Sequence, residues 1–190
     1  MADRPPVRHA ALHGSTLPTR VGSFAVTPIA HSGRLSWRGP PEPMSSVFGV
    51  DLPTTPMRAA CMGDRVALWL GPDEWLLLLP EADLPSLRAR LSAAPLAMAG
   101  SLVDISHRDV GLLIAGRDAS WLLAAGCPLD LDISAFPVGM CTRTLLAKAE
   151  IVLWRSGADV FRLEVQRSFA SYVAAFLCEA AHDSPDPAPR

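Results

Sequence analysis

The chain has 190 residues, of which 49% are apolar and 19% charged, so it is long enough to bury a substantial core and is expected to be globular. A formal net charge of −2 argues against a nucleic-acid-binding protein. The sequence has no apolar run of about 18 residues, which excludes a transmembrane helix. A mean hydropathy of +0.24 is high for a monomer, which predicts that another chain covers part of the surface.

The compartment is predicted from the first residues and the cysteines. The opening residues MADRPPVRHAALHGS contain no apolar segment of the kind found in a secretory signal, so we expect a cytoplasmic protein. Cys61, Cys127, Cys141 and Cys178 are therefore expected to be reduced thiols. Because their spacing matches no Cys/His metal pattern, no metal site is predicted.

Proline is concentrated near the start of the chain, where half of the 18 prolines fall within the first 56 residues. This composition predicts a disordered arm over residues 1–20 and an extended, mostly irregular segment over 21–56. A second proline-rich stretch predicts a disordered tail over 183–190. The folded body is expected to be a single globular domain over residues 21–182.

The clearest element in chain order is a hairpin in LWLGPDEWLLLLP, residues 68–80. Pro72 and Asp73 suit the two central positions of a tight turn. The flanking strands, predicted at 65–70 and 75–79, are apolar on both faces. Strands of this kind lie inside a sheet or under a partner, because a half-solvated strand alternates with polar residues.

Further along the chain, short alternating runs predict strands and amphipathic runs predict helices. The strands are expected near 101–105, 109–115, 142–147, 150–155 and 159–165, and the helices near 83–92, 118–126 and 168–181. In the last strand, Arg162, Glu164 and Gln166 share one face, which is predicted to be wet.

Two parts of the chain resemble each other, since Leu68-Trp69, a turn, Asp73, Trp75 and Leu77 match Leu153-Trp154, a turn, Asp159, Phe161 and Leu163. An amphipathic helix follows each copy. A duplication explains this pattern, and so does shared hairpin chemistry. The first explanation predicts an α+β fold of two similar β-β-α halves, about 21–100 and 101–182, around a mixed or antiparallel sheet. It does not predict a Rossmann fold.

No arrangement of residues predicts catalysis in this chain. Asp104, Ser106 and His107 are too close in sequence to form a catalytic triad, which is assembled from separate loops, so a turn held by hydrogen bonds is the favoured interpretation. Glycine-rich phosphate loops for FAD, NAD or ATP are absent. Arg143 and Arg167 adjoin strand ends and are candidates to hold a partner's carboxylate, whereas Arg155 and Arg162 are expected on a solvated face.

Four segments, in this order and spacing, resemble the gamma subunit of heterotetrameric sarcosine oxidase over about residues 47–182. They are LGPDEWLL (70–77), VDISHR (103–108), GCPLDL (126–131) and RSFASY (167–172). The resemblance implies a fold like the folate-binding domain of the glycine cleavage T-protein. It also implies a non-catalytic structural or assembly subunit that packs mainly on the alpha subunit, with the beta and delta subunits in the same complex.

The resembled complex demethylates sarcosine oxidatively to glycine, with hydrogen peroxide and methylene-tetrahydrofolate or formaldehyde as further products. The resemblance places FAD, FMN, NAD, tetrahydrofolate and zinc in the other subunits. No residue here is assigned to catalysis or metal binding, and the candidate subunit-interface residues are Trp69, Trp75, His107, Arg108, Arg143 and Arg167. Two alternatives stay open, the equivalent subunit of N-methylglutamate dehydrogenase and a stand-alone folate-binding protein in which Asp104 holds the pterin.

Overall fold

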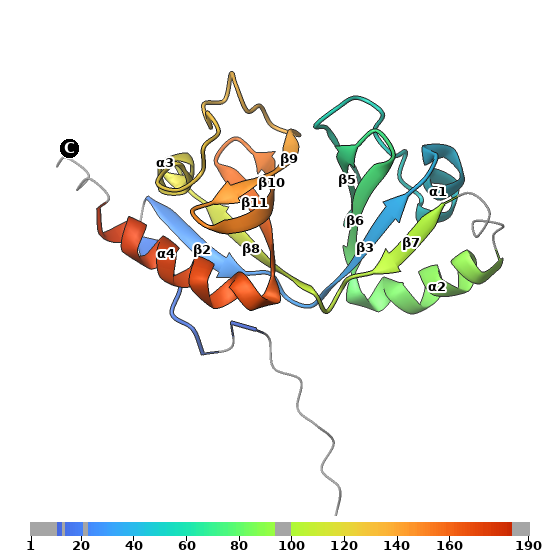
Figure 1. The fold of residues 1–190 in the computed structure, drawn as a ribbon, viewed down its shortest axis with the longest axis horizontal. Coiled ribbons are helices and arrows are strands. Elements are labelled where there is room, and N and C mark those ends of the chain that lie inside the picture. The colour runs from blue at the N-terminus through green and yellow to red at the C-terminus, as the bar shows by residue number, and fades with distance from the viewer. Residues whose placement is uncertain (1–10, 13, 21–22, 94–99, 184–190) are drawn as a thin grey trace, which may run out of the picture.

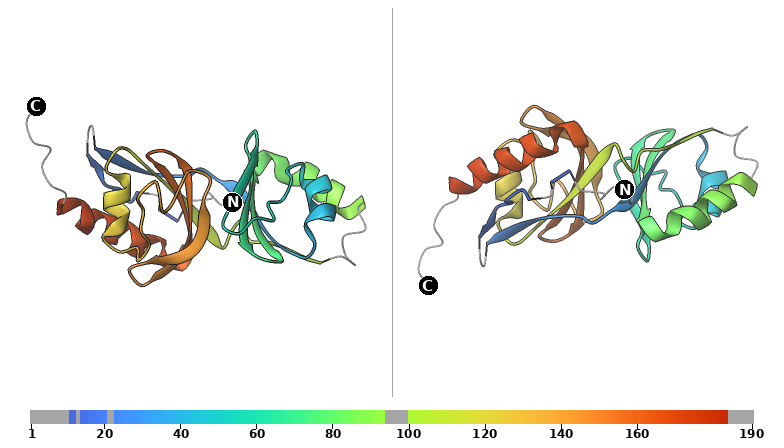
Figure 2. Two further views of the ribbon diagram at one scale, coloured as in Figure 1. Left: turned by 90° about the horizontal axis from the view of Figure 1, so that it is seen from above. Right: turned by 90° about the horizontal axis from the view of Figure 1, so that it is seen from below.

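The computed structural model describes residues 11–12, 14–20, 23–93 and 100–183, which form two lobes (Figure 1). Each lobe has an antiparallel sheet with two helices on its outer face, and the two sheets face each other (Figure 2). The predicted α+β class is confirmed, and all strand pairings are antiparallel among the described residues.

The first lobe contains a five-stranded sheet and two helices. Its strands, in sheet order, are β4 (Ala59–Met62), β5 (Arg65–Gly71), β6 (Glu74–Pro80), β3 (Ser32–Arg38) and β7 (Ser101–Asp104). Its helices are α1 (Pro41–Phe48) and α2 (Leu84–Ala93), with the short 3-10 helix η1 (Glu81–Asp83) leading into α2.

The second lobe contains a six-stranded sheet and two helices. Its strands, in sheet order, are β1 (Thr19–Arg20), β2 (Phe24–Pro28), β8 (Asp109–Ala115), β11 (Val160–Gln166), β10 (Ala149–Gly157) and β9 (Cys141–Leu146). Its helices are α3 (Ala119–Ala124) and α4 (Ala170–His182), and the 3-10 helix η3 (Arg167–Phe169) precedes α4.

The two lobes repeat one topology, as the predicted duplication requires. The order β4-β5-β6-β3-β7 in the first lobe corresponds to β9-β10-β11-β8-β2 in the second. Yet the predicted boundary between residues 100 and 101 does not separate the lobes. β2 precedes the first lobe in the chain but pairs with β8, and β7 pairs with β3, so the lobes exchange strands through two adjacent linkers (Figure 1).

The prediction of an irregular segment over residues 21–56 is wrong, because this segment contains β2, β3 and α1. Proline fits α1 because Pro41 occupies the first turn, where backbone N–H groups have no helical partner in any case. The helix ends at Gly49, whose φ of 81° is the left-handed conformation that favours glycine.

The predicted arm over residues 1–20 also ends too late. Leu12 is 5% exposed and belongs to the core of the second lobe, and Thr19–Arg20 pair with β2. Residues 1–10 of that arm, and residues 184–190 of the predicted tail, lie outside the described residues.

The predicted hairpin is β5 and β6, and both of its apolar faces are covered within the chain. Ala67, Trp75 and Leu77 pack in the core of the first lobe. Leu68 and Leu76 belong to a separate core between the lobes, which also contains Cys141 of β9. The hairpin therefore needs no partner chain to bury it. None of the described helices is long and apolar enough to cross a membrane.

Candidate functional site

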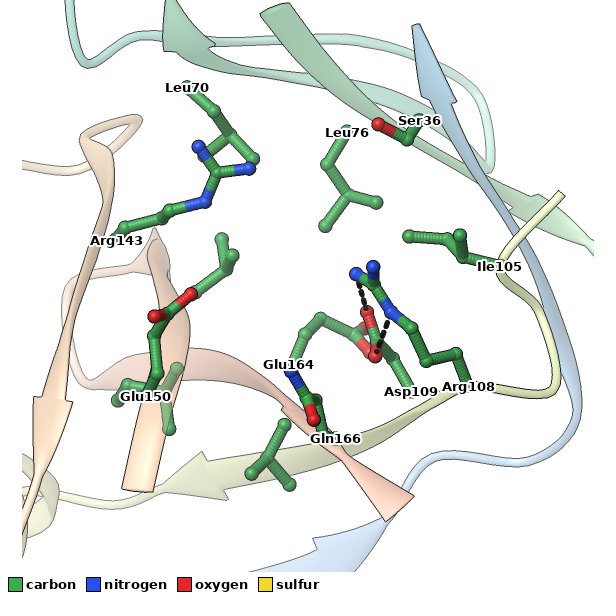
Figure 3. A pocket seen from close by; sticks show the side chains of 13 residues that line it. Ser36, Leu70, Leu76, Ile105, Arg108, Asp109, Arg143, Glu150, Glu164 and Gln166 are labelled. Carbon is green, nitrogen blue, oxygen red and sulfur yellow. Dashed lines mark hydrogen bonds and ion pairs between the residues drawn. The ribbon is translucent and has the colours of Figure 1, made fainter. Parts of the chain in front are cut away.

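A cavity of 170 Å³ lies between the two sheets and is lined by strands of both lobes (Figure 3). Its polar lining includes Ser36, Arg108, Asp109, Arg143, Glu150, Glu164 and Gln166, and its apolar lining includes Leu70, Leu76, Ile105 and Val152. Residues of β3, β5 and β6 in the first lobe and of β8, β9, β10 and β11 in the second contribute to its walls. We call it the interlobe pocket.

Glu74, at the start of β6, joins the lobes beside this pocket. Arg143 of β9 donates from Nη1 to Glu74 Oε2 (3.0 Å) and from Nη2 to Oε1, while Arg38 donates to Oε2 (2.7 Å). The hydrogen bond from Arg143 lowers the pKa of Glu74, against the opposing effect of burial. In turn, the Glu74 carboxylate raises the pKa of Arg143.

The Glu74 pair predicts a pH-dependent stability. A carboxyl group with a lowered folded pKa stabilises the fold fully above its unfolded pKa of about 4.3, and this stabilisation is lost as the pH falls through the folded pKa. We expect Glu74→Gln to lower the free energy of unfolding by about 1–2 kcal/mol at pH 7. The difference from the unsubstituted protein should shrink below about pH 4. Urea unfolding at both pH values measures this, and a difference independent of pH would contradict it.

Arg108 reaches the pocket from the turn between β7 and β8. Its Nε donates to Asp109 Oδ1 (2.9 Å) and its Nη2 to Oδ2 (3.0 Å), so Asp109 holds one edge of the guanidinium. The hydrogen bonds with Asp109 raise the pKa of Arg108. Figure 3 shows the other edge of the guanidinium directed into the cavity.

A buried ion pair ties the lobes together below the pocket. Arg34 of β3 donates from Nε to Glu164 Oε2 of β11 (2.5 Å), and these residues are 3% and 2% exposed. Arg162 donates to the other carboxylate oxygen (2.7 Å). Gly111 of β8 makes room for the pair, because a Cβ there would lie 2.8 Å from Arg34 Nη2. The prediction that Glu164 faces water is therefore wrong, since that face meets the other lobe.

The cysteine between the lobes is not a nucleophile. Burial raises the pKa of Cys141 to about 12, so its thiol stays protonated at neutral pH. Its Sγ lies 3.5 Å from the Trp69 carbonyl oxygen, as expected for a donor. Among the described residues, no group of three or more His, Cys, Asp and Glu is arranged to hold a metal ion.

Comparison with known proteins identifies the family. The model of the sarcosine oxidase gamma subunit family matches residues 43–183. The chain belongs to this family. Sarcosine oxidase subunit gamma of Corynebacterium sp. strain P-1 is 30% identical over 186 residues, which are 93% of this chain and 89% of that protein. The subunit of strain U-96 is 33% identical over 142 residues, which are 72% of this chain and 66% of that protein.

Two solved structures extend the comparison. A chain of heterotetrameric sarcosine oxidase from Corynebacterium sp. U-96, in complex with pyrrole 2-carboxylate, has a TM-score of 0.82 and 25% identity, over 95% of this chain and 99% of that one. The glycine cleavage aminomethyltransferase T of Bartonella henselae has a TM-score of 0.60 and 16% identity, over 85% of this chain and 50% of that one. The second similarity confirms the predicted T-protein-like fold.

For this gamma-subunit family member, five of the six predicted interface residues are exposed or partly exposed, and the sixth, Trp75, is buried. Arg108 and Arg143 meet at the interlobe pocket, and the Arg167 backbone N–H donates to the Arg108 carbonyl (2.8 Å), which places η3 beside them. His107 is exposed in the same turn. Trp69 is partly buried at the edge of the first lobe's core.

Trp75 does not belong in this set. It is 1% exposed, and its Nε1 donates to the Pro53 carbonyl (2.8 Å) inside the first lobe. A strand that is apolar on both faces does not show whether a tryptophan is buried by its own chain or by a partner, which explains the error.

Asp104, the candidate for pterin binding, lies outside the interlobe pocket. Its Oδ1 accepts from the Ser106 backbone N–H (2.9 Å) and its Oδ2 from Arg88 (2.6 Å). Partial burial acts to raise the pKa of Asp104, but the hydrogen bonds from Ser106 and Arg88 outweigh it and lower the pKa. The favoured interpretation, a turn held by hydrogen bonds, agrees with this geometry.

No role was predicted from the sequence for Arg34, Glu74 or Glu150. Each is a charged residue of a largely apolar strand, with no local motif. For Arg34 and Glu74 the available signal was charge at a buried strand position, because such charges need partners.

Proposed function

We propose that this chain is the gamma subunit of a heterotetrameric sarcosine oxidase and that its role there is structural, in assembly. The supporting observation is the similarity to a chain of that heterotetramer over 95% of this chain, at a TM-score of 0.82. In this proposal the chain acts in the cytoplasm and packs mainly on the alpha subunit, with beta and delta in the same complex. The other subunits bind FAD, FMN, NAD, tetrahydrofolate and zinc and convert sarcosine to glycine.

The chemistry of the interlobe pocket favours a role without catalysis. A general base works best with a pKa near the working pH, whereas Arg143 lowers the pKa of Glu74. Arginines also hold Asp109 and Glu164, so these two carboxylates serve the fold. Protonated Cys141 offers no thiolate.

The proposed contact with the alpha subunit centres on exposed side chains of η3 and the first turn of α4. Arg167 is exposed there. Phe169 and Tyr172 follow it, 41% and 37% exposed, with their rings in an edge-to-face arrangement at 6.5 Å. Arginine and aromatic residues are enriched at interfaces, and a guanidinium suits a partner carboxylate. His107, Arg108 and Arg143 extend this surface towards the pocket, and partly buried Trp69 completes the proposed interface.

Assembly tests this role. Co-expressing the four subunits, with a tag on alpha, should yield a complete oxidase, and omitting this chain should leave the remaining subunits incompletely assembled. We expect Arg167→Glu to reduce capture by alpha at least tenfold, corresponding to about 1.4 kcal/mol, because it reverses the charge at the proposed contact. Arg117→Glu, at an arginine beside α3, should assemble normally. A fully assembled and active oxidase without this chain would refute the proposal.

Two alternatives remain. The same subunit could serve N-methylglutamate dehydrogenase, because the other chains would choose the substrate, and purifying the complex with its substrate would decide. The T-protein-like fold favours a stand-alone folate-binding protein, although a fold alone does not carry function. Micromolar binding of tetrahydrofolate by this chain in calorimetry would favour that alternative.

A further inference from the structure

The interlobe pocket contains an arginine positioned to bind a ligand. Asp109 occupies the Nε and Nη2 side of the Arg108 guanidinium, and Nη1 makes no hydrogen bond to any described residue. Asp109 itself is 8% exposed, so this anchor is built into the fold. The outer edge of Arg108, formed by Nη1 and Nη2, is directed into the cavity (Figure 3). An edge with two parallel N–H groups suits a carboxylate.

The opposite wall offers a negative charge. Glu150 of β10 lines the cavity, and its carboxylate accepts no hydrogen bond from the described residues. It is nonetheless near both arginines, because its charge contributes to raising the pKa of Arg108 and of Arg143. Arg143 gives both its Nη atoms to Glu74. Glu150 is therefore available to accept hydrogen bonds from a ligand ammonium group.

The remaining wall is apolar, formed by Leu70, Leu76, Ile105 and Val152. The cavity of 170 Å³ accommodates only a small molecule. We propose that the interlobe pocket binds a small zwitterionic α-amino acid. Its carboxylate lies on the outer edge of Arg108, its ammonium group on Glu150, and its short side chain against the apolar wall. Arg108 also belongs to the proposed contact with the alpha subunit, so ligand binding is tested on this chain without the other subunits.

Binding by the full chain tests the inference, with L-alanine as the probe in titration calorimetry or ligand-observed NMR. We expect a Kd of about 1 mM, appropriate to a ligand with so few atoms. Propionate lacks the ammonium group and ethylamine lacks the carboxylate, so each should bind at least tenfold more weakly than L-alanine. Glu150→Gln and Arg108→Gln should each weaken L-alanine binding at least tenfold.

Matched substitutions outside the pocket serve as controls. Glu179→Gln and Arg117→Gln remove the same charges from exposed positions, and L-alanine should bind to both as to the unsubstituted chain. Circular dichroism verifies that each variant is folded. No binding of L-alanine at 20 times the expected Kd, equal binding of propionate or ethylamine, or unchanged binding in both pocket variants would overturn the inference. Assembly of the oxidase is measured separately, so each proposal can fail alone.

Discussion

Arg34→Met is expected to lower the free energy of unfolding by about 3–5 kcal/mol, because it leaves the Glu164 carboxylate buried with one of its two arginines. Glu164 is 2% exposed, so solvation compensates poorly for the lost partner. The pair also holds β3 against β11, and its loss weakens the junction between the lobes. Urea unfolding followed by tryptophan fluorescence measures the change in free energy.

A double substitution separates the cost of an unpaired charge from the loss of a contact. Arg34→Met combined with Glu164→Leu removes both charges of the most buried pair and leaves only Arg162, whose side chain is 15% exposed, so we expect the double variant to be more stable than Arg34→Met. Arg38→Met is the matched control, because Arg38 also pairs with a glutamate but its side chain is 60% exposed, which predicts a loss of at most about 1 kcal/mol. Equal losses for Arg34→Met and Arg38→Met would contradict the assigned role.

Local patterns predicted the elements that depend on neighbours in sequence. The expected strand 109–115 is β8, and the expected 159–165 is β11 within one residue at each end. Alternation worked there because one face of each strand packs under a helix of its own lobe. The hairpin from β5 to β6 was found because its tight turn has residues with the required conformations.

The strands that the sequence did not predict form only through pairing with distant parts of the chain. β3 carries Gly33, Arg34 and Ser36, which are poor strand residues by themselves, and it forms because β6 and β7 pair on both sides. The exchange of β2 and β7 between lobes leaves no local signal at all. Strand pairing over such separations is a tertiary property, so the two-halves prediction gave the right repeat with the wrong boundary.

The candidate site was foreseen only in part. Arg143 was a candidate to hold a partner's carboxylate and Arg108 a candidate interface residue, and the structure pairs them with Glu74 and Asp109 of the same chain. The pocket between them could not be predicted, because residues of both lobes line it. The apolar hairpin was expected inside a sheet or under a partner; it lies inside the first lobe's sheet, and the second lobe covers one of its faces. An apolar strand face predicted from the sequence does not show whether the residues that bury it belong to the same chain or to a partner.

Arg155→Met is expected to destabilise the second lobe by about 3–5 kcal/mol, although the sequence predicted a solvated arginine there. Arg155 is 4% exposed and donates to the carbonyls of Ala158 (3.0 Å from Nε), Leu131 (3.0 Å) and Phe136 (2.9 Å). Its guanidinium also lies 4.8 Å from the Phe161 ring centroid. One cation thus holds the segment between α3 and β9, and its loss leaves buried carbonyl groups without donors.

Hydrogen exchange locates the effect of this substitution. Amide exchange across residues 128–140 should accelerate at least tenfold in Arg155→Met, beyond the change in the first lobe, because Arg155 binds the carbonyls of that segment. Arg155→Lys should recover little, since a single ammonium group cannot reach carbonyls at two separate edges of the guanidinium. Lys148→Met, at the exposed turn between β9 and β10, is the matched control and should leave exchange unchanged. If Arg155→Lys proved as stable as the unsubstituted chain, the charge alone, and not the forked geometry of arginine, would hold this segment in place.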